Sequence, residues 1–249
     1  MYIEFIGPPG SGKTFFFKKL SKFLKKKKID FETPRNVFIN YYVRKKSNDY
    51  KIGKYLFKYY FKYINPYSKF LFKKETQNLK LFIEREINTS KRIKAILMNY
   101  KNFLKDVILP KSLVERMLLN FKIDCIGIMK SKNKLLIAEE GIYQKFFLNF
   151  KSKKKKINRF NLVEVFKNLK NPNIIFHFNY DIKDSIARSK KRNKGFKYFI
   201  RRKFILNDKE FFNDYLIDFL EKKKINIFKV YSNKKINIEL NESFARRLF

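Results

Sequence analysis

The feature that most constrains this chain is a glycine-rich segment near its start that fits the pattern G-x-x-x-x-G-K-[ST]. The segment runs through Gly7, Pro8, Pro9, Gly10, Ser11, Gly12, Lys13 and Thr14. The apolar run Tyr2–Ile6 before it predicts a strand, and residues 15–24 after it predict a helix. A strand, a glycine-rich loop and a helix in this order predict a loop that binds phosphate groups.

Each residue type in this loop has a physical role. Glycine tolerates positive φ and has no Cβ, so backbone N–H groups around Gly7, Gly10 and Gly12 can turn toward phosphate oxygens. The ammonium of Lys13 can reach the β- and γ-phosphates of a nucleotide, and the hydroxyl of Thr14 can ligate Mg²⁺. The loop therefore predicts ATP and Mg²⁺ as cofactors.

The composition excludes several other chemistries. A chain of 249 residues with 45% hydrophobic content is expected to form one α/β domain over residues 1–249. Cys125 is the single cysteine, which rules out an intrachain disulfide and a cysteine metal cluster. His177 is the single histidine and lies in an apolar run, so we expect a buried strand histidine and no multi-histidine metal site. Phosphoryl transfer needs none of these groups.

The net charge of +38 comes mostly from lysines that are spread along the chain. They accompany abundant Asn, Ile, Phe and Tyr, and this joint bias is typical of AT-rich coding sequence rather than of one selected basic patch. We therefore expect no specific nucleic-acid partner. The runs at 25–28 and 153–156 predict solvated helix ends or loops, and peripheral contact with an anionic membrane surface stays open.

Apolar runs are all shorter than the roughly 20 residues that span a bilayer, and the first predicted strand begins at residue 2. The sequence therefore predicts an intracellular, cytoplasmic protein without a signal peptide.

Further elements follow along the chain. Residues 29–32 predict a short strand closed by 33–36, and 70–122 predict a largely helical stretch. Residues 54–64 predict a mostly buried helix, with a dimer face or an interfacial membrane helix as alternatives. Helices are also predicted near 161–169, 181–194 and 208–223 and at the C-terminus, and strands at 134–141, 173–179 and 225–231. Strands that alternate with helices imply a parallel sheet.

Two carboxylates end the predicted strand at 134–141. Beside a phosphate-binding loop, such a carboxylate can hold Mg²⁺ directly or through water. Neighbouring strand residues point to opposite faces, so we expect different roles: Glu139 with Thr14 at the metal, and Glu140 as a catalytic base or substrate contact. Which glutamate does which stays open.

Two arginines lie one helical turn apart in the segment 181–194. Arg188 and Arg192 at i and i+4 share one helix face and could close over a transferring phosphoryl group. The alternative is a lysine-rich solvated helix.

Taken in order, these features resemble the nucleoside and nucleotide kinase group of P-loop proteins, especially thymidylate kinase and deoxynucleoside kinase relatives. The resemblance implies a three-layer α/β P-loop NTPase fold with a mainly parallel sheet and a helical substrate region at about 50–125, inserted before the third strand. It also implies a mobile lid helix at about 181–202 that carries Arg188 and Arg192. Glu32 would match the acid after the family's second strand, with one residue inserted before Pro34.

This resemblance implies an ATP-dependent phosphotransferase that acts on a small-molecule hydroxyl or phosphate acceptor. Lys13, Glu32, Glu140, Arg188 and Arg192 would be its catalytic residues. The sequence Glu-Glu-Gly at 139–141 departs from the family's Asp-Arg and Glu-Arg-Ser patterns, so the acceptor stays open. The alternative function is a nucleotide-regulated protein that transfers no phosphate and binds nucleic acid or an anionic membrane surface. A homodimer also stays open.

Overall fold

The structure is a computed structural model that describes residues 1–7, 10–46, 73–105, 111–132, 134–147, 166–168, 170–179 and 210–231. The chain divides into two compact units. The first, called here the sheet unit, comprises Met1–Phe31, Lys134–Lys151 and Asn171–Phe249. The second, called the helical unit, comprises Glu32–Asn133 and Ser152–Lys170. The expectation of one domain over residues 1–249 stays a prediction.

The sheet unit is built on a five-stranded sheet with the order β2-β3-β1-β4-β5. Its strands are β1 (Tyr2–Ile6), β2 (Phe31–Glu32), β3 (Leu135–Ala138), β4 (Ile174–Asn179) and β5 (Asn226–Tyr231). β1 pairs in parallel with both β3 and β4, and β4 pairs in parallel with β5. The predicted α/β class with a mainly parallel sheet is confirmed.

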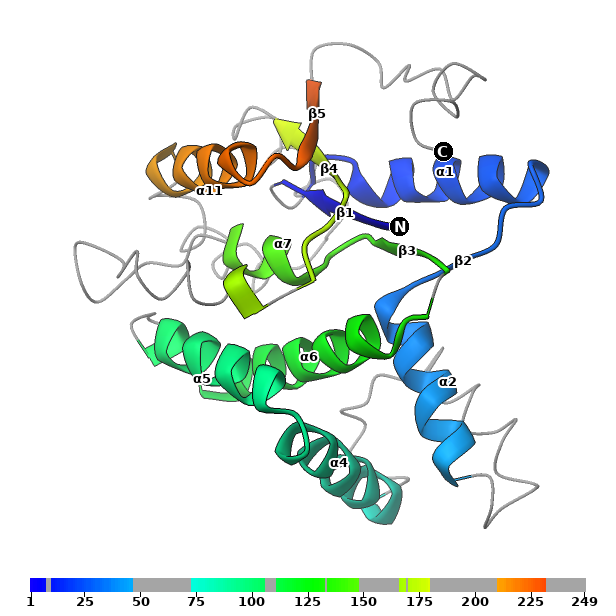
Figure 1. Cartoon of the computed structure of the whole chain (residues 1–249), viewed down its shortest axis with the longest axis vertical. Coiled ribbons are helices and arrows are strands. Elements are labelled where there is room, and N and C mark those ends of the chain that lie inside the picture. Colours follow the sequence, from blue (N-terminus) through cyan, green and yellow to red (C-terminus); the bar gives the residue numbers. More distant parts are fainter. Residues whose placement is uncertain are drawn as a thin grey trace, which may run out of the picture. The chain divides into compact units, whose positions relative to one another are not determined.

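The helix after the glycine-rich loop, α1 (Lys13–Lys26), covers one face of this sheet (Figure 1). Its buried apolar residues recur every four positions, at Phe16, Leu20 and Leu24. The Phe16 ring centroid lies 5.4 Å from that of Phe5 on β1 and 5.0 Å from that of Phe176 on β4. Aromatic rings at such separations attract one another beyond the area that they bury, so this cluster fixes α1 against the strands.

The opposite face of the sheet carries the alternate residues of β1, Tyr2 and Glu4 among them. Two helices, α7 (Ile142–Phe147) and α11 (Glu210–Lys222), lie on this side (Figure 1). The end of β1, where the loop begins, is thus enclosed between α1 on one face and α7 on the other.

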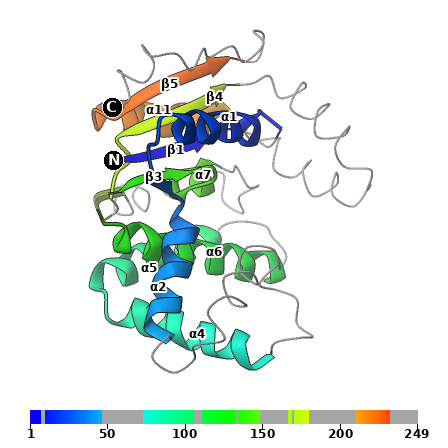
Figure 2. The same cartoon turned by 90° about the vertical axis from the view of Figure 1, so that its right-hand side faces the viewer.

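The helical unit contains four helices among its described residues, seen from the side in Figure 2. They are α2 (Pro34–Lys46), α4 (Lys73–Asn88), α5 (Lys91–Lys105) and α6 (Lys111–Lys130). α2 and α6 approach so closely at Gly127 that a Cβ there would lie 2.0 Å from the Pro34 carbonyl oxygen. Between α5 and α6, the rings of Tyr100 and Phe121 stack with their centroids 3.9 Å apart.

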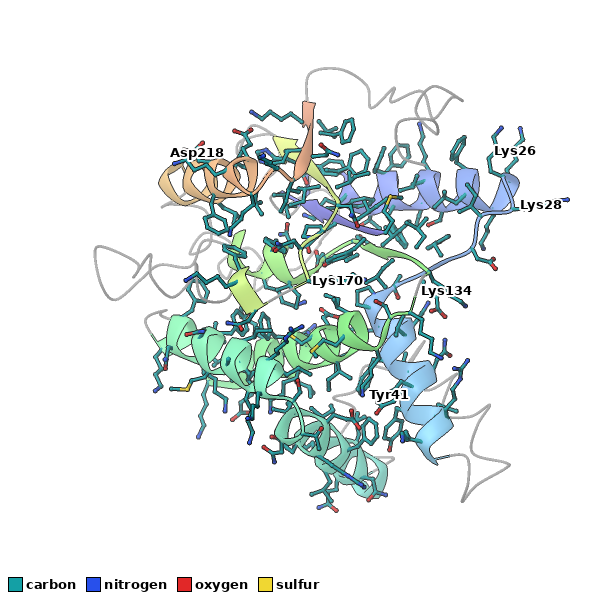
Figure 3. The ribbon with its side chains drawn as sticks, in the orientation of Figure 1. Lys26, Lys28, Tyr41, Lys134, Lys170 and Asp218 are labelled. Atoms are coloured by element: carbon teal, nitrogen blue, oxygen red, sulfur yellow. The ribbon has the colours of Figure 1, made fainter. Side chains whose placement is uncertain are left out.

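A polar contact joins three of these helices. The Tyr41 hydroxyl of α2 donates to Glu86 Oε1 of α4 at 2.8 Å, and Lys130 Nζ of α6 lies 3.2 Å from Glu86 Oε2. The Lys130 ammonium also lies 4.5 Å from the centroid of the Tyr41 ring. Tyr41 is labelled on α2 in Figure 3. The Glu86 carboxylate thus binds both Tyr41 and Lys130, and these contacts connect α2, α4 and α6.

The strand predicted at 29–32 ends at Glu32, as expected, and the residues that close it also begin α2, a helix that the sequence did not predict. Thr33 caps the helix: its Oγ1 accepts the Asn36 N–H at 3.2 Å, and its carbonyl accepts the Val37 N–H at 3.0 Å. Pro34 occupies the first helical position, where a missing N–H costs no hydrogen bond. The Thr-Pro pair after β2 therefore begins a helix.

The other predicted elements in the described residues are present. Within 70–122 lie α4, α5 and the first part of α6, and 208–223 contains α11. Residues 166–168 are helical, as predicted for 161–169. The helices predicted at 54–64, at 181–194 and at the C-terminus lie outside the described residues.

Candidate phosphate-binding site

The glycine-rich loop joins the end of β1 to the start of α1. Its glycines all have positive φ, 150° at Gly7, 88° at Gly10 and 94° at Gly12. A Cβ on Gly7 would lie 2.7 Å from both the Cβ and the carbonyl oxygen of Phe178, so only glycine fits there. Pro8 and Pro9 lie outside the described residues.

The loop leads into the N-terminus of α1, and the Lys13 side chain, its cation, begins at that same point. Lys13 is the first residue of α1, is only 5% exposed, and donates from Nζ to the Gly7 carbonyl at 2.7 Å. Gly12 precedes the helix without a side-chain cap, so the first-turn N–H groups are available to an anion. Ser11 is fully buried, and its hydroxyl has no hydrogen-bond partner among the described residues. A phosphate fits this combination of cation, donors and glycine backbone.

The structure brings two predicted metal ligands together. The Thr14 hydroxyl donates to Glu139 Oε1, across 125 positions of sequence. The contact follows from the sheet order, because β1 and β3 are parallel neighbours and their carboxyl ends share one edge. A hydroxyl and a carboxylate match the oxygen ligands of Mg²⁺, which usually keeps several waters and takes few protein ligands.

The part of the chain that the structure describes holds no cluster of three or more His, Cys, Asp and Glu side chains that could bind a metal ion. A metal at Thr14 and Glu139 would therefore rely on water and phosphate for its other ligands.

Glu139 and Glu140 do not belong to a strand, contrary to the prediction that they end one and point to opposite faces. The third strand ends at Ala138, and both glutamates lie in the turn after it, so strand alternation does not apply to them. Their surroundings differ all the same: Glu139 is half-buried against Thr14, whereas Glu140 is exposed.

The remaining predicted catalytic residues belong to the helical unit or lie outside the described residues. Glu32 ends β2 and belongs to the helical unit, where its Oε1 accepts a hydrogen bond from Asn40 Nδ2 at 3.2 Å. Arg188 and Arg192, with the predicted lid at 181–202, lie outside the described residues. Their roles stay predictions.

Sequence reasoning missed a buried polar network beneath the loop. Gln144 of α7 holds both backbone groups of Gly7: Oε1 accepts the Gly7 N–H at 2.8 Å, and Nε2 donates to the Gly7 carbonyl at 3.0 Å. Glu4, fully buried in β1, accepts the Gln144 backbone N–H at 2.8 Å and the Tyr2 hydroxyl at 2.5 Å. A Cβ on Gly141 would lie 2.4 Å from the Glu4 carboxyl carbon. The available signal was a glutamate in the middle of an apolar strand.

Burial raises the pKa of the Glu4 carboxyl from an ordinary value of 4.5 to about 7. The main cause is the loss of water around the charge, while the Tyr2 hydroxyl, the Gln144 N–H and the Lys145 ammonium favour the charged form and oppose the rise. The Glu4 carboxyl, whose pKa lies near neutral pH, is therefore connected to Gly7 of the glycine-rich loop through Gln144: one hydrogen bond joins Glu4 to the Gln144 backbone, and the Gln144 amide bonds to Gly7.

Replacing Glu4 with glutamine is expected to remove a pH dependence of folding stability. Because folding raises this pKa, the folded state binds the proton more tightly than the unfolded state. The stability from Glu4 is fully present below about pH 4.5 and is lost as the pH rises through about 7. Between about pH 5 and pH 8, wild type should lose roughly 2 to 3 kcal/mol relative to Glu4→Gln. Urea unfolding of both proteins across this range measures the difference, and parallel curves would contradict the assignment.

His177 behaves as the buried strand histidine that was predicted. It lies on β4, 8% exposed, and burial together with the nearby Lys229 charge lowers its pKa to about 4. The imidazole is therefore neutral at physiological pH.

The lysine run at the end of α1 is solvated, as predicted. Lys25, Lys26, Lys27 and Lys28 are all exposed, and Figure 3 shows Lys26 and Lys28 extending away from the helix. The second run, at 153–156, lies outside the described residues. Of the helices that the structure describes, none has both the length and the apolarity to cross a membrane.

The chain was compared with protein families, curated proteins and solved structures. No protein-family model and no curated protein matches the sequence. A solved structure of a deoxyadenosine kinase from M. mycoides with bound dCTP is similar at 13% identity and a TM-score of 0.41, over 100% of this chain and 98% of that chain. At that TM-score the overlap supports no conclusion about this chain.

Proposed function

We propose that this chain binds ATP with Mg²⁺ and transfers the γ-phosphoryl group to a hydroxyl or a phosphate of a small molecule. The observation that carries the proposal is the contact between Thr14 and Glu139, because it adds a carboxylate to the described part of the glycine-rich loop. The acid comes from the turn after β3, so the sheet order places a carboxylate beside the start of α1, where a metal bound to nucleotide phosphates needs one.

Each residue of the site has a proposed task. Backbone N–H groups of residues 10–14 and the Lys13 ammonium hold the phosphates, and Lys13 is already oriented by the Gly7 carbonyl. Thr14 and Glu139 hold the metal. When bound, Mg²⁺ supplies positive charge between the β- and γ-phosphates. The low exposure of Lys13 strengthens its attraction to an anion, since less water screens the charge.

A transfer assay with γ-labelled ATP tests the reaction class. Wild-type protein is incubated with panels of nucleosides, nucleotides and sugars, and water serves as the control acceptor. We expect label in one acceptor class, above the rate of hydrolysis. ATP binding with no transfer to any acceptor would contradict the kinase proposal and favour the nucleotide-regulated protein that binds nucleic acid or an anionic membrane surface.

The two adjacent glutamates give a matched pair of variants. Glu139→Gln keeps an oxygen that accepts from Thr14 but removes the charge, so the Mg²⁺ concentration for half-maximal transfer should rise about 10- to 100-fold. Glu140→Gln, one position away, should leave the Mg²⁺ requirement and MgATP affinity unchanged and lower kcat. Titration of Mg²⁺ against the transfer rate measures both. An unchanged Mg²⁺ requirement in Glu139→Gln, or an equal rise in both variants, would remove Glu139 from the metal site.

A further inference from the structure

Both backbone polar groups of Gly7, the first residue of the phosphate-binding loop, are held by one side chain. The Gln144 amide accepts the Gly7 N–H at 2.8 Å and donates to the Gly7 carbonyl at 3.0 Å. The same carbonyl accepts the hydrogen bond from Lys13 Nζ at 2.7 Å. The Gln144 amide therefore holds the peptide groups on both sides of the Gly7 Cα, and the second of them carries the carbonyl that binds the Lys13 ammonium.

Gln144 is itself held in place. It is 1% exposed, and its backbone N–H donates to Glu4 Oε1 at 2.8 Å. The other oxygen of Glu4 accepts the Tyr2 hydroxyl at 2.5 Å, and the carboxyl packs where Gly141 has no side chain. These contacts leave the amide little freedom to rotate, so its geometry toward Gly7 is fixed before any ligand arrives.

We propose that Gln144, anchored by Glu4, is a positioning residue that presets the phosphate-binding loop for nucleotide. The inference rests on the function proposed above. It follows from energetics: without the amide, the buried Gly7 N–H loses its partner and the Gly7 carbonyl keeps only the Lys13 ammonium, so more of the loop must be ordered at the moment of binding. Gln144 does not contact the phosphates; it acts through Gly7 and Lys13.

The loop itself provides a readout that needs no ligand. Gln144→Met keeps the length and volume of the side chain and removes both hydrogen bonds. We expect the Gly7 amide to exchange with solvent about 10-fold faster or more, since two hydrogen bonds hold this residue. Tyr143→Phe is the matched control: it removes the bond from the adjacent α7 residue to Asn171 Oδ1 and does not touch Gly7. Equal Gly7 exchange in wild type and Gln144→Met would overturn the proposal.

Affinity provides the second readout. Gln144→Met should bind MgATP about 10-fold more weakly or worse, and Tyr143→Phe within about twofold of wild type. Gln144→Glu is the variant to use if Gln144→Met does not fold, because it keeps an oxygen toward the Gly7 N–H and loses only the donor to the carbonyl. MgATP affinity at the wild-type level in a folded Gln144 variant would refute positioning. Absence of MgATP binding in wild type would instead refute the proposed function, and the exchange measurement would still decide the role of Gln144.

Discussion

Replacing Lys13 with alanine is expected to weaken MgATP binding, and to slow any phosphoryl transfer, by about 100- to 1,000-fold. Lys13 is buried at the start of α1, with Nζ at 2.7 Å from the Gly7 carbonyl. A cation that is fixed and shielded from water interacts with phosphate far more strongly than an exposed one. Isothermal titration with MgATP measures the affinity, and the labelled-ATP assay measures the rate.

Lys18→Ala is the matched control, because Lys18 lies on the same helix and is exposed. It should bind MgATP within about twofold of wild type, which separates the loop cation from the general positive charge of the chain. Lys13→Arg retains the charge but replaces the compact ammonium with a larger planar group. We expect it to weaken MgATP binding nearly as much as Lys13→Ala does. Thermal unfolding shows whether each variant is folded. A folded Lys13→Ala protein with wild-type affinity would refute the phosphate-loop assignment.

The glycine-rich loop and the contact between Thr14 and Glu139 could be predicted from sequence, because both depend on local pattern and sheet topology. Three glycines at fixed spacing, followed by Lys13 and Thr14, leave few alternatives for the backbone. An acid that follows a strand can reach Thr14 only if that strand lies beside β1. β3 is such a neighbour, and Glu139 follows it directly. The sequence alone therefore sufficed to predict that Thr14 and Glu139, 125 positions apart, lie together.

The network beneath the loop could not be predicted, because no motif marks it. Gln144 lies on a helix of six residues that follows Gly141, too short for hydrophobic periodicity to reveal. A glutamine amide can pair with any backbone group that tertiary packing brings near it. Glu4 was visible as an acid within an apolar strand, but its partners Tyr2 and Gln144 are identified only by the fold.

The start of α2 was missed for a different reason. Thr33 followed by Pro34 was interpreted as the end of a strand and no more, although a threonine cap and a proline at the first position also favour a helix start. The sequence from Val37 to Tyr42 contains four side chains that are buried in the structure, Val37, Phe38, Ile39 and Tyr42. They do not form a narrow stripe, so amphipathic periodicity was too weak to identify the helix.

If the segment 181–194 closes over the transferring phosphoryl group, replacing Arg188 or Arg192 is expected to lower kcat about 1,000-fold or more. Both residues lie outside the described part of the chain, so the prediction rests on their i, i+4 spacing and on the family resemblance. A guanidinium that meets the phosphoryl group only in the transition state adds little to binding of the ground state. MgATP affinity should therefore change by no more than a few fold while the transfer rate falls.

Lys190→Ala and Lys191→Ala are the controls, because both lysines lie between the two arginines and carry the same charge, and Lys190 lies on another face of the predicted helix. We expect both to keep the transfer rate within about twofold of wild type. Single-turnover measurements with saturating MgATP separate the chemical step from binding. If all four substitutions have equal and small effects, the segment is a solvated basic helix, and the positive charge at the transferring group has to come from Lys13 alone among the residues assigned to this site. In that case Lys13→Ala should abolish transfer more completely than it weakens binding, which the same titration and turnover measurements would reveal.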